Sequence, residues 1–76
     1  MYRIITEKTK ELKDGRTNKY ISEIVGINTC YLTSILTGNK PCSKIIAMAL
    51  INIKTNIPIG TKKMEVELNK YFHKED

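Results

Sequence analysis

With 76 residues and a formal net charge of +5, the chain is long enough for one small basic domain. A domain of this size buries only about 60% of the surface that its unfolded chain exposes, so an oligomeric partner would add stability. No apolar run approaches the roughly 18 residues of a membrane-spanning helix, and the N-terminus lacks the hydrophobic region of a signal peptide, so we expect a cytoplasmic protein.

The positive charge is unevenly distributed along the chain. Residues 1–63 hold 11 basic and 4 acidic side chains, a net +7, whereas residues 64–76 hold 2 basic and 4 acidic ones, a net −2. No acidic residue occurs between Glu23 and Glu65. A surface without carboxylates approaches phosphates without repulsion, and each lysine placed on a phosphate releases counterions. Lysine used only for solubility, in a protein from an AT-rich genome, is the alternative explanation.

Residues 3–13 are predicted to form the first helix. Apolar residues as far as Leu12 fall on one side of it at helical spacing, and Asp14-Gly15 ends it with a turn. Thr17 is then a suitable N-cap for a second helix, because its hydroxyl can accept a backbone N–H of the first turn. We expect Tyr20 to pack between these two helices.

The second predicted helix, Asn18–Val25, leads through a tight turn into a third. Gly26 adopts positive φ at little cost and so ends the helix in a left-handed turn. Ile27 then points inward between the two helices. Asn28 is expected to cap the third helix by accepting a backbone N–H near Tyr31.

The third predicted helix runs from Thr29 to Thr37. Its inward face carries Leu32, Ile35 and Leu36. Two helices that meet across a glycine-containing turn form a helix-turn-helix unit, whose second helix can lie in the major groove of DNA. The outward face holds Thr29, Cys30, Tyr31, Thr33, Ser34 and Thr37.

The fourth predicted helix follows Ser43, its N-cap, and runs from Lys44 to about Ile53. It is apolar on nearly every side, and a helix of this kind is buried on every side. We therefore expect it to form the centre of the core, with any surplus apolar face covered by the last helix or by a second subunit.

The last predicted helix runs from residue 61 or 62 to about His73. It follows a non-helical connector at residues 55–60, in which Ile57 and Ile59 could form one short extended edge. An apolar stripe on the helix either completes the core of the monomer or forms a dimer interface. This stripe consists of Met64, Leu68, Tyr71 and Phe72.

The spacing of small and apolar residues across the second and third helices is specific. Counted from Asn18, the fourth, fifth, eighth, tenth, fifteenth and eighteenth positions hold Ile21, Ser22, Val25, Ile27, Leu32 and Ile35. This spacing resembles that of the Cro/repressor-like helix-turn-helix family of phage and bacterial regulators. The segment Thr37-Gly38-Asn39-Lys40-Pro41 is similar to the loop that follows the recognition helix in that family. The resemblance covers roughly residues 3–53 and implies an all-α, compact five-helix, lambda-repressor-like domain.

The resemblance also implies a function. Proteins of this kind bind double-stranded DNA as homodimers and regulate transcription, with two recognition helices in successive major grooves. By resemblance, the residues that face base edges are Thr29, Cys30, Tyr31 and Ser34, with Asn28 beside them. Those that contact phosphates are Asn18, Lys19, Thr33, Thr37, Asn39, Lys40 and Lys44.

The predicted recognition helix has no Arg, Lys, Gln or Asn after its cap. The strongest base-specific pairs, Arg with guanine and Gln or Asn with adenine, are therefore missing, and thymine-methyl contacts and single hydroxyl bonds remain. We expect an AT-rich operator, modest base discrimination and a large contribution from phosphates and DNA shape. A protein-interaction module on the same scaffold, such as an antirepressor or antitoxin, is the alternative function.

The sequence predicts neither a catalytic site nor a metal site. It has no paired carboxylates, no glycine-rich phosphate loop, and no nucleophile with a base near it in sequence. Cys30 and Cys42 are predicted to be free thiols, and the single histidine, His73, is 31 residues from the nearer cysteine. We expect no enzyme activity, no cofactor, no small-molecule substrate and no membrane partner.

Overall fold

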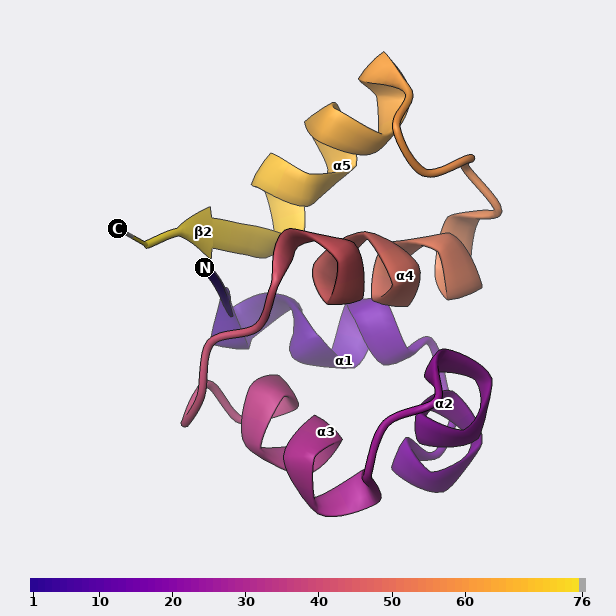
Figure 1. The fold of residues 1–76 in the computed structure, drawn as a ribbon, viewed down its shortest axis with the longest axis vertical. Helices are drawn as coiled ribbons and strands as arrows, with labels where there is room; N and C mark the ends of the chain where they lie inside the picture. Colours follow the sequence, from indigo (N-terminus) through magenta and orange to yellow (C-terminus); the bar gives the residue numbers. More distant parts are fainter. Residues whose placement is uncertain (76) are drawn as a thin grey trace.

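The structure is a computed structural model that describes residues 1–75, and these form five α-helices, one 3₁₀ helix and two short strands. In chain order the elements are β1 (Tyr2–Ile4), the 3₁₀ helix η1 (Thr6–Lys8), α1 (Thr9–Lys13), α2 (Asn18–Val25), α3 (Thr29–Leu36), α4 (Lys44–Thr55), α5 (Lys62–Tyr71) and β2 (Phe72–Lys74). Helix α4 crosses the middle of the molecule, with α5 on one side and α1 on the other (Figure 1). Helices α2 and α3 lie at the end away from α5.

The prediction of a compact five-helix domain is confirmed, but the fold is not strictly all-α, because the two ends of the described chain form a small antiparallel sheet. Strand β1 pairs with β2 in a register that places Tyr2 opposite Lys74 and Ile4 opposite Phe72. Tyr2 also exchanges two backbone hydrogen bonds of 2.7 Å with Cys42, so β1 lies between β2 and the segment before α4. This sheet brings both ends of the described chain to the loop that follows α3.

Three predicted helices are shorter than expected, α3 by one residue only, since it ends at Leu36 with Thr37 as its C-cap. Helix α1 begins only at Thr9, after the separate turn η1, because Tyr2 and Ile4 are buried with Arg3 between them, a period of two that belongs to a strand. Helix α5 ends at Tyr71, not at His73, because Phe72 adopts extended backbone and enters β2. Phe72 is still buried, so the strand keeps it in the core.

Helix α4 forms the centre of the core, as predicted, but it is not buried on every side. Ala47, Met48, Leu50 and Ile51 are buried, whereas the side chain of Ile45 is 64% exposed. Helices α1, α2 and α5 all contact α4, and none of them covers Ile45 near its N-terminus. The helix also extends two residues beyond the predicted end, to Thr55, and Asn56 caps it in the left-handed conformation.

The apolar stripe of α5 completes the core of the monomer. Met64 and Leu68 are fully buried, and Tyr71 is 1% exposed. A dimer cannot use this stripe without first opening the fold, so of the two alternatives that the sequence left, the structure favours core completion. Elsewhere in the same half of the chain, Ile57 packs against the core, Ile59 is exposed, and neither belongs to a strand.

The expectation that Tyr20 packs between the first two helices is wrong, since its side chain is 50% exposed. Helix α2 buries Ile21 and Ser22, and consecutive residues of an α-helix are separated by about 100° around the axis. Tyr20 therefore lies at the edge of the buried face and turns to solvent, as does Ile24, which is 53% exposed.

Candidate DNA-binding surface

The turn between α2 and α3 has the conformation that the sequence predicted. Gly26 adopts φ 82°, and its N–H donates to the carbonyl of Ser22 at 2.8 Å, which ends α2 in a left-handed cap. Ile27 is half-buried against the core. Asn28 caps α3, but its side-chain oxygen accepts from the N–H of Cys30 at 2.7 Å, one residue before the predicted position.

Two side-chain hydrogen bonds hold α2 against α3. The hydroxyls of Ser22 and Thr29 lie 2.9 Å apart, and Ser22 is 2% exposed, so this contact lies inside the helix pair. The amide nitrogen of Asn18 donates to the hydroxyl of Thr33 at 3.2 Å. Because Asn18 donates one amide hydrogen to Thr33 on α3, only its second amide hydrogen is available to a phosphate. The two bonds fix how the outward face of α3 is presented to solvent.

The outward face of α3 presents hydroxyl oxygens as acceptors. Thr33, Ser34 and Thr37 each donate their hydroxyl hydrogen to the carbonyl four residues earlier, at 2.9, 3.1 and 2.9 Å. Because these hydrogens are used, the hydroxyl oxygens of Ser34 and Thr37 can only accept in this arrangement, for example from the amino group of adenine or cytosine, whereas that of Thr33 already accepts from Asn18. The same hydroxyls must rotate before they can donate to a phosphate oxygen.

The structure keeps most of the predicted base-facing residues at the surface. Asn28, Thr29 and Cys30 are exposed, whereas Tyr31 and Ser34 are half-buried, Tyr31 packing against the core. The loop after α3 folds back on the helix, since the N–H groups of residues 39 and 40 both donate to the carbonyl of Ser34, at 2.9 and 3.1 Å. The exposed residues among the predicted phosphate contacts are Lys19, Thr33, Thr37, Asn39, Lys40 and Lys44.

Lys44 differs from the other predicted phosphate contacts because it has an acidic partner. Its ammonium lies 2.8 Å from a carboxylate oxygen of Glu65 on α5. Hydrogen bonding to that carboxylate raises the pKa of Lys44 above its ordinary value. The segment between Glu23 and Glu65 contains no acidic residue, but in the folded chain Lys44 of this segment contacts the Glu65 carboxylate. This contact weakens the electrostatic attraction of Lys44 to a phosphate. No local pattern predicts this pair, whose members are 21 residues apart.

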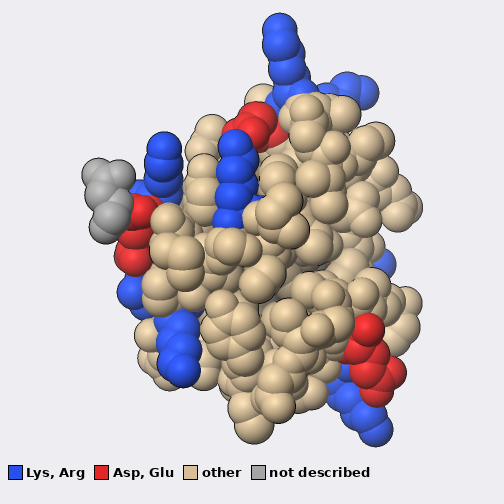
Figure 2. Space-filling view, viewed as in Figure 1, with Lys and Arg blue, Asp and Glu red and all other residues tan. Residues whose placement is uncertain are grey.

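Basic side chains are not gathered in one patch on the face shown in Figure 2. They project from several edges of the molecule, and acidic side chains lie beside some of them. Net charge alone therefore does not single out α3 as a nucleic-acid contact. The local arrangement of exposed polar side chains on α3, with Lys19 and Lys40 exposed on the flanking segments, is the more specific feature.

Arg3 is a residue of this surface that the sequence did not indicate. Its Nη1 donates to the carbonyl of Gly38 at 2.6 Å, and its Nε donates to a carboxylate oxygen of Glu75 at 2.6 Å. One guanidinium thus joins the sheet, the end of the described chain and the loop after α3. The hydrogen bond from Arg3 lowers the pKa of Glu75, and the same bond raises the pKa of Arg3.

The Arg3–Glu75 pair predicts a pH-dependent contribution to stability. Because the pKa of Glu75 lies below its ordinary 4.5 in the folded chain, the pair stabilises the fold above that pH. The contribution is lost as the pH falls through the lowered pKa. We expect Glu75→Gln to reduce the melting temperature slightly at neutral pH and to match the wild type in acid. Thermal melts across pH check this, with Glu67→Gln as control; a difference that persists in acid would contradict it.

The two thiols lie in different environments. Cys30 is exposed on α3, whereas Cys42 is fully buried, and burial raises its pKa to about 11. Since the thiolate is the reactive form, we expect iodoacetamide to label Cys30 alone in the folded chain and both cysteines after denaturation. Mass spectrometry of the labelled chain measures this. Equal labelling of both thiols before denaturation would show that the segment around Cys42 opens readily.

No protein-family model, no curated protein and no solved structure matches the chain. Within residues 1–75, no helix is both long enough and apolar enough to cross a bilayer. The same part of the chain holds no group of three or more His, Cys, Asp or Glu side chains placed to bind a metal ion.

Proposed function

We propose that this chain is a sequence-specific double-stranded-DNA-binding regulator of transcription, a Cro-like or repressor-like switch protein of phage or mobile-element origin. The observation that supports this best is the α2–α3 unit. Its second helix is anchored by the buried residues Leu32, Ile35 and Leu36, and the opposite face is polar and open to solvent. This is the arrangement in which the second helix of a helix-turn-helix unit lies in a major groove. The lambda-repressor-like arrangement of the five helices is part of the same proposal.

In the proposed complex, α3 lies in the major groove and makes weak individual contacts. Thr29 and Cys30 contact thymine methyl groups, and the outward oxygen of Ser34 accepts from a base amino group. Lys19 and Lys40, on either side of α3, contact phosphates and fix the position of the helix. Occupancy of a promoter then blocks transcription, and no further chemistry is needed.

The proposal includes a homodimer, whose two recognition helices enter successive major grooves about 34 Å apart. Since the α5 stripe is buried in the monomer, the dimer must use other apolar side chains. Ile45 and Val66 are 64% and 67% exposed. Their neighbours Lys44 and Glu65 form an ion pair between α4 and α5, so the two apolar residues lie on adjoining parts of these helices.

A protein-interaction module, such as an antirepressor or antitoxin, is the second candidate. Two observations favour it: α3 lacks residues that read bases in pairs of hydrogen bonds, and α2 exposes Tyr20 and Ile24. Exposed apolar and aromatic side chains close together on one helix are typical of protein contacts. In this function α2 and α3 would contact a protein partner rather than DNA.

Selection of bound duplexes from a random DNA library tests the proposal. We expect enrichment of an AT-rich inverted repeat with half-sites about one helical turn apart, and an affinity that falls steeply with salt. Binding without enrichment would overturn sequence specificity and leave a general DNA-binding role. No binding at low salt would overturn the DNA function and favour a protein partner.

A further inference from the structure

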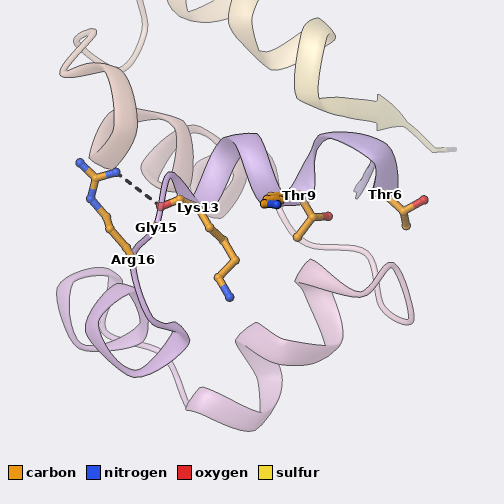
Figure 3. Close-up of a pocket in the computed structure, with 6 residues that line it drawn as sticks. Thr6, Thr9, Lys13, Gly15 and Arg16 are labelled. Carbon is orange, nitrogen blue, oxygen red and sulfur yellow. Dashed lines mark hydrogen bonds between the residues drawn. The ribbon is translucent and has the colours of Figure 1, made fainter.

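A cationic cleft lies along α1, outside the residues discussed so far as DNA contacts. It is open to solvent, has a volume of about 520 Å³ and is lined by Thr6, Thr9, Lys10, Lys13, Gly15 and Arg16. Figure 3 shows Lys13 extended from the end of α1, and Arg16 bonded to the Lys13 carbonyl. Three of the six lining residues carry a positive charge, so the cleft is suited to an anion.

The cleft adjoins the α2–α3 unit at both ends. At one end, the hydroxyl of Thr9 donates to the carbonyl of Leu36, the last residue of α3, at 2.9 Å. Thr6 lies against the loop that follows, since a Cβ on Gly38 would come within 2.9 Å of its methyl carbon. At the other end, Arg16 precedes the N-cap of α2 by one residue. The cleft therefore connects the loop that holds Lys40 to the helix start that holds Lys19.

Most of the positive charge in the cleft has no acidic partner. Within residues 1–75, neither Lys10 nor Lys13 forms an ion pair, while Arg16 lies 3.5 Å from a carboxylate oxygen of Asp14. Residues three apart on a helix lie on neighbouring parts of one face, so Lys10 and Lys13 are about 4.5 Å apart along the axis of α1. The two side chains therefore start from neighbouring positions on one face of α1, and their flexible stems allow the two ammonium groups to contact successive phosphates of one strand.

We propose that this cleft binds the phosphodiester backbone of DNA beside the segment that α3 reads, with Lys10 and Lys13 each contacting a phosphate. The inference rests on the proposed DNA-binding function and extends its contact surface to α1. Helix α3 makes only weak contacts with bases, and the additional phosphate contacts would supply DNA affinity that this helix lacks. Thr6, exposed at the loop end of the cleft, adds a hydroxyl donor to the same backbone.

The test compares two double variants that remove the same charge. Lys10→Gln/Lys13→Gln alters the cleft, and Lys62→Gln/Lys63→Gln removes two exposed lysines at the start of α5, at the opposite end of the molecule from α3 (Figure 1). Affinity for a selected duplex is measured across salt. Two lost phosphate contacts reduce the slope of log affinity against log salt by about 1.8, so we expect this reduction in the cleft variant and no change in the control.

Each outcome decides the inference. Unchanged slope in the cleft variant overturns it and leaves the proposed function intact, whereas failure of the wild type to bind any duplex at low salt overturns both. Equal reductions in the two variants overturn the cleft as a specific contact. The single variant Lys10→Gln changes only one exposed side chain, so it is expected to fold even if the double variant does not. If the inference holds, it reduces the salt slope by about half as much as the double variant. Pyrophosphate that saturates the cleft without weakening DNA binding would identify a small-anion site instead.

Discussion

Replacing Leu32 by alanine is expected to lower the free energy of unfolding by about 2–5 kcal/mol. Leu32 is fully buried and anchors α3 to the core, so the truncation removes apolar contacts and leaves a cavity that the surrounding helices fill only in part. A domain of 76 residues has a total stability of roughly 4–11 kcal/mol, at about 0.05–0.15 kcal/mol per residue. The loss is therefore a large fraction of what holds the fold together.

Urea denaturation followed by circular dichroism measures this loss, with Ile24→Ala as the matched control. Ile24 lies on α2 and is 53% exposed, so its truncation is expected to change stability by about 0.5 kcal/mol or less. A Leu32→Ala variant as stable as the control would mean that α3 is not anchored by its inner face. That result would also remove the main structural support for the proposed function.

The parts of the fold that depend on neighbouring residues were predictable. Helix α2 has its predicted bounds because Thr17 accepts from the N–H of Tyr20 at one end and Gly26 takes the left-handed conformation at the other. Ser43 caps α4 in the same way, by accepting from the N–H of Ile46 at 3.2 Å. Such signals act over a few residues, so a single sequence is enough to place them.

The parts that depend on distant residues were not predictable. Strands β1 and β2 have three residues each and lie about 70 positions apart, so neither shows enough alternation to be told from a helix end. Their pairing decides where α1 begins and where α5 stops. The contact of Arg3 with Gly38 and that of Lys44 with Glu65 also join separate elements, and both alter the surroundings of predicted site residues.

Among the candidate site residues, helical periodicity predicted which ones face outward but not how their polar groups are used. Thr33 and Thr37 are exposed as expected, yet their hydroxyl hydrogens bond to carbonyls of α3. Asn18 bonds to Thr33 rather than lying free at the start of α2. These bonds depend on the rotamer of each side chain and the angle between two helices, which sequence spacing does not fix. The assignment of these residues to bases and phosphates remains a prediction.

Reversing two charges beside α3 is expected to have the largest effect on DNA binding. Lys19 and Lys40 are exposed, and neither forms an ion pair within residues 1–75. If each makes one charge-assisted phosphate contact of about 1.5 kcal/mol, Lys19→Glu/Lys40→Glu weakens binding to a selected duplex by about 100-fold or more. Both side chains are in solvent, so the melting temperature of the variant is expected to stay close to that of the wild type.

Fluorescence anisotropy at fixed salt measures this effect, and Lys62→Glu/Lys63→Glu is the control with the same change in net charge. If the lysines beside α3 act by contact, the control loses only the small affinity that follows from a lower overall charge. Equal losses in both variants would show that attraction between the whole protein and DNA, and not α3 and its flanks, carries the binding. An unaffected Lys19→Glu/Lys40→Glu variant would move the DNA contact away from the α2–α3 unit altogether. In that case the cationic cleft on α1 would have to bind DNA without α3 in the groove, and the same titration of its glutamine variant would show whether it does.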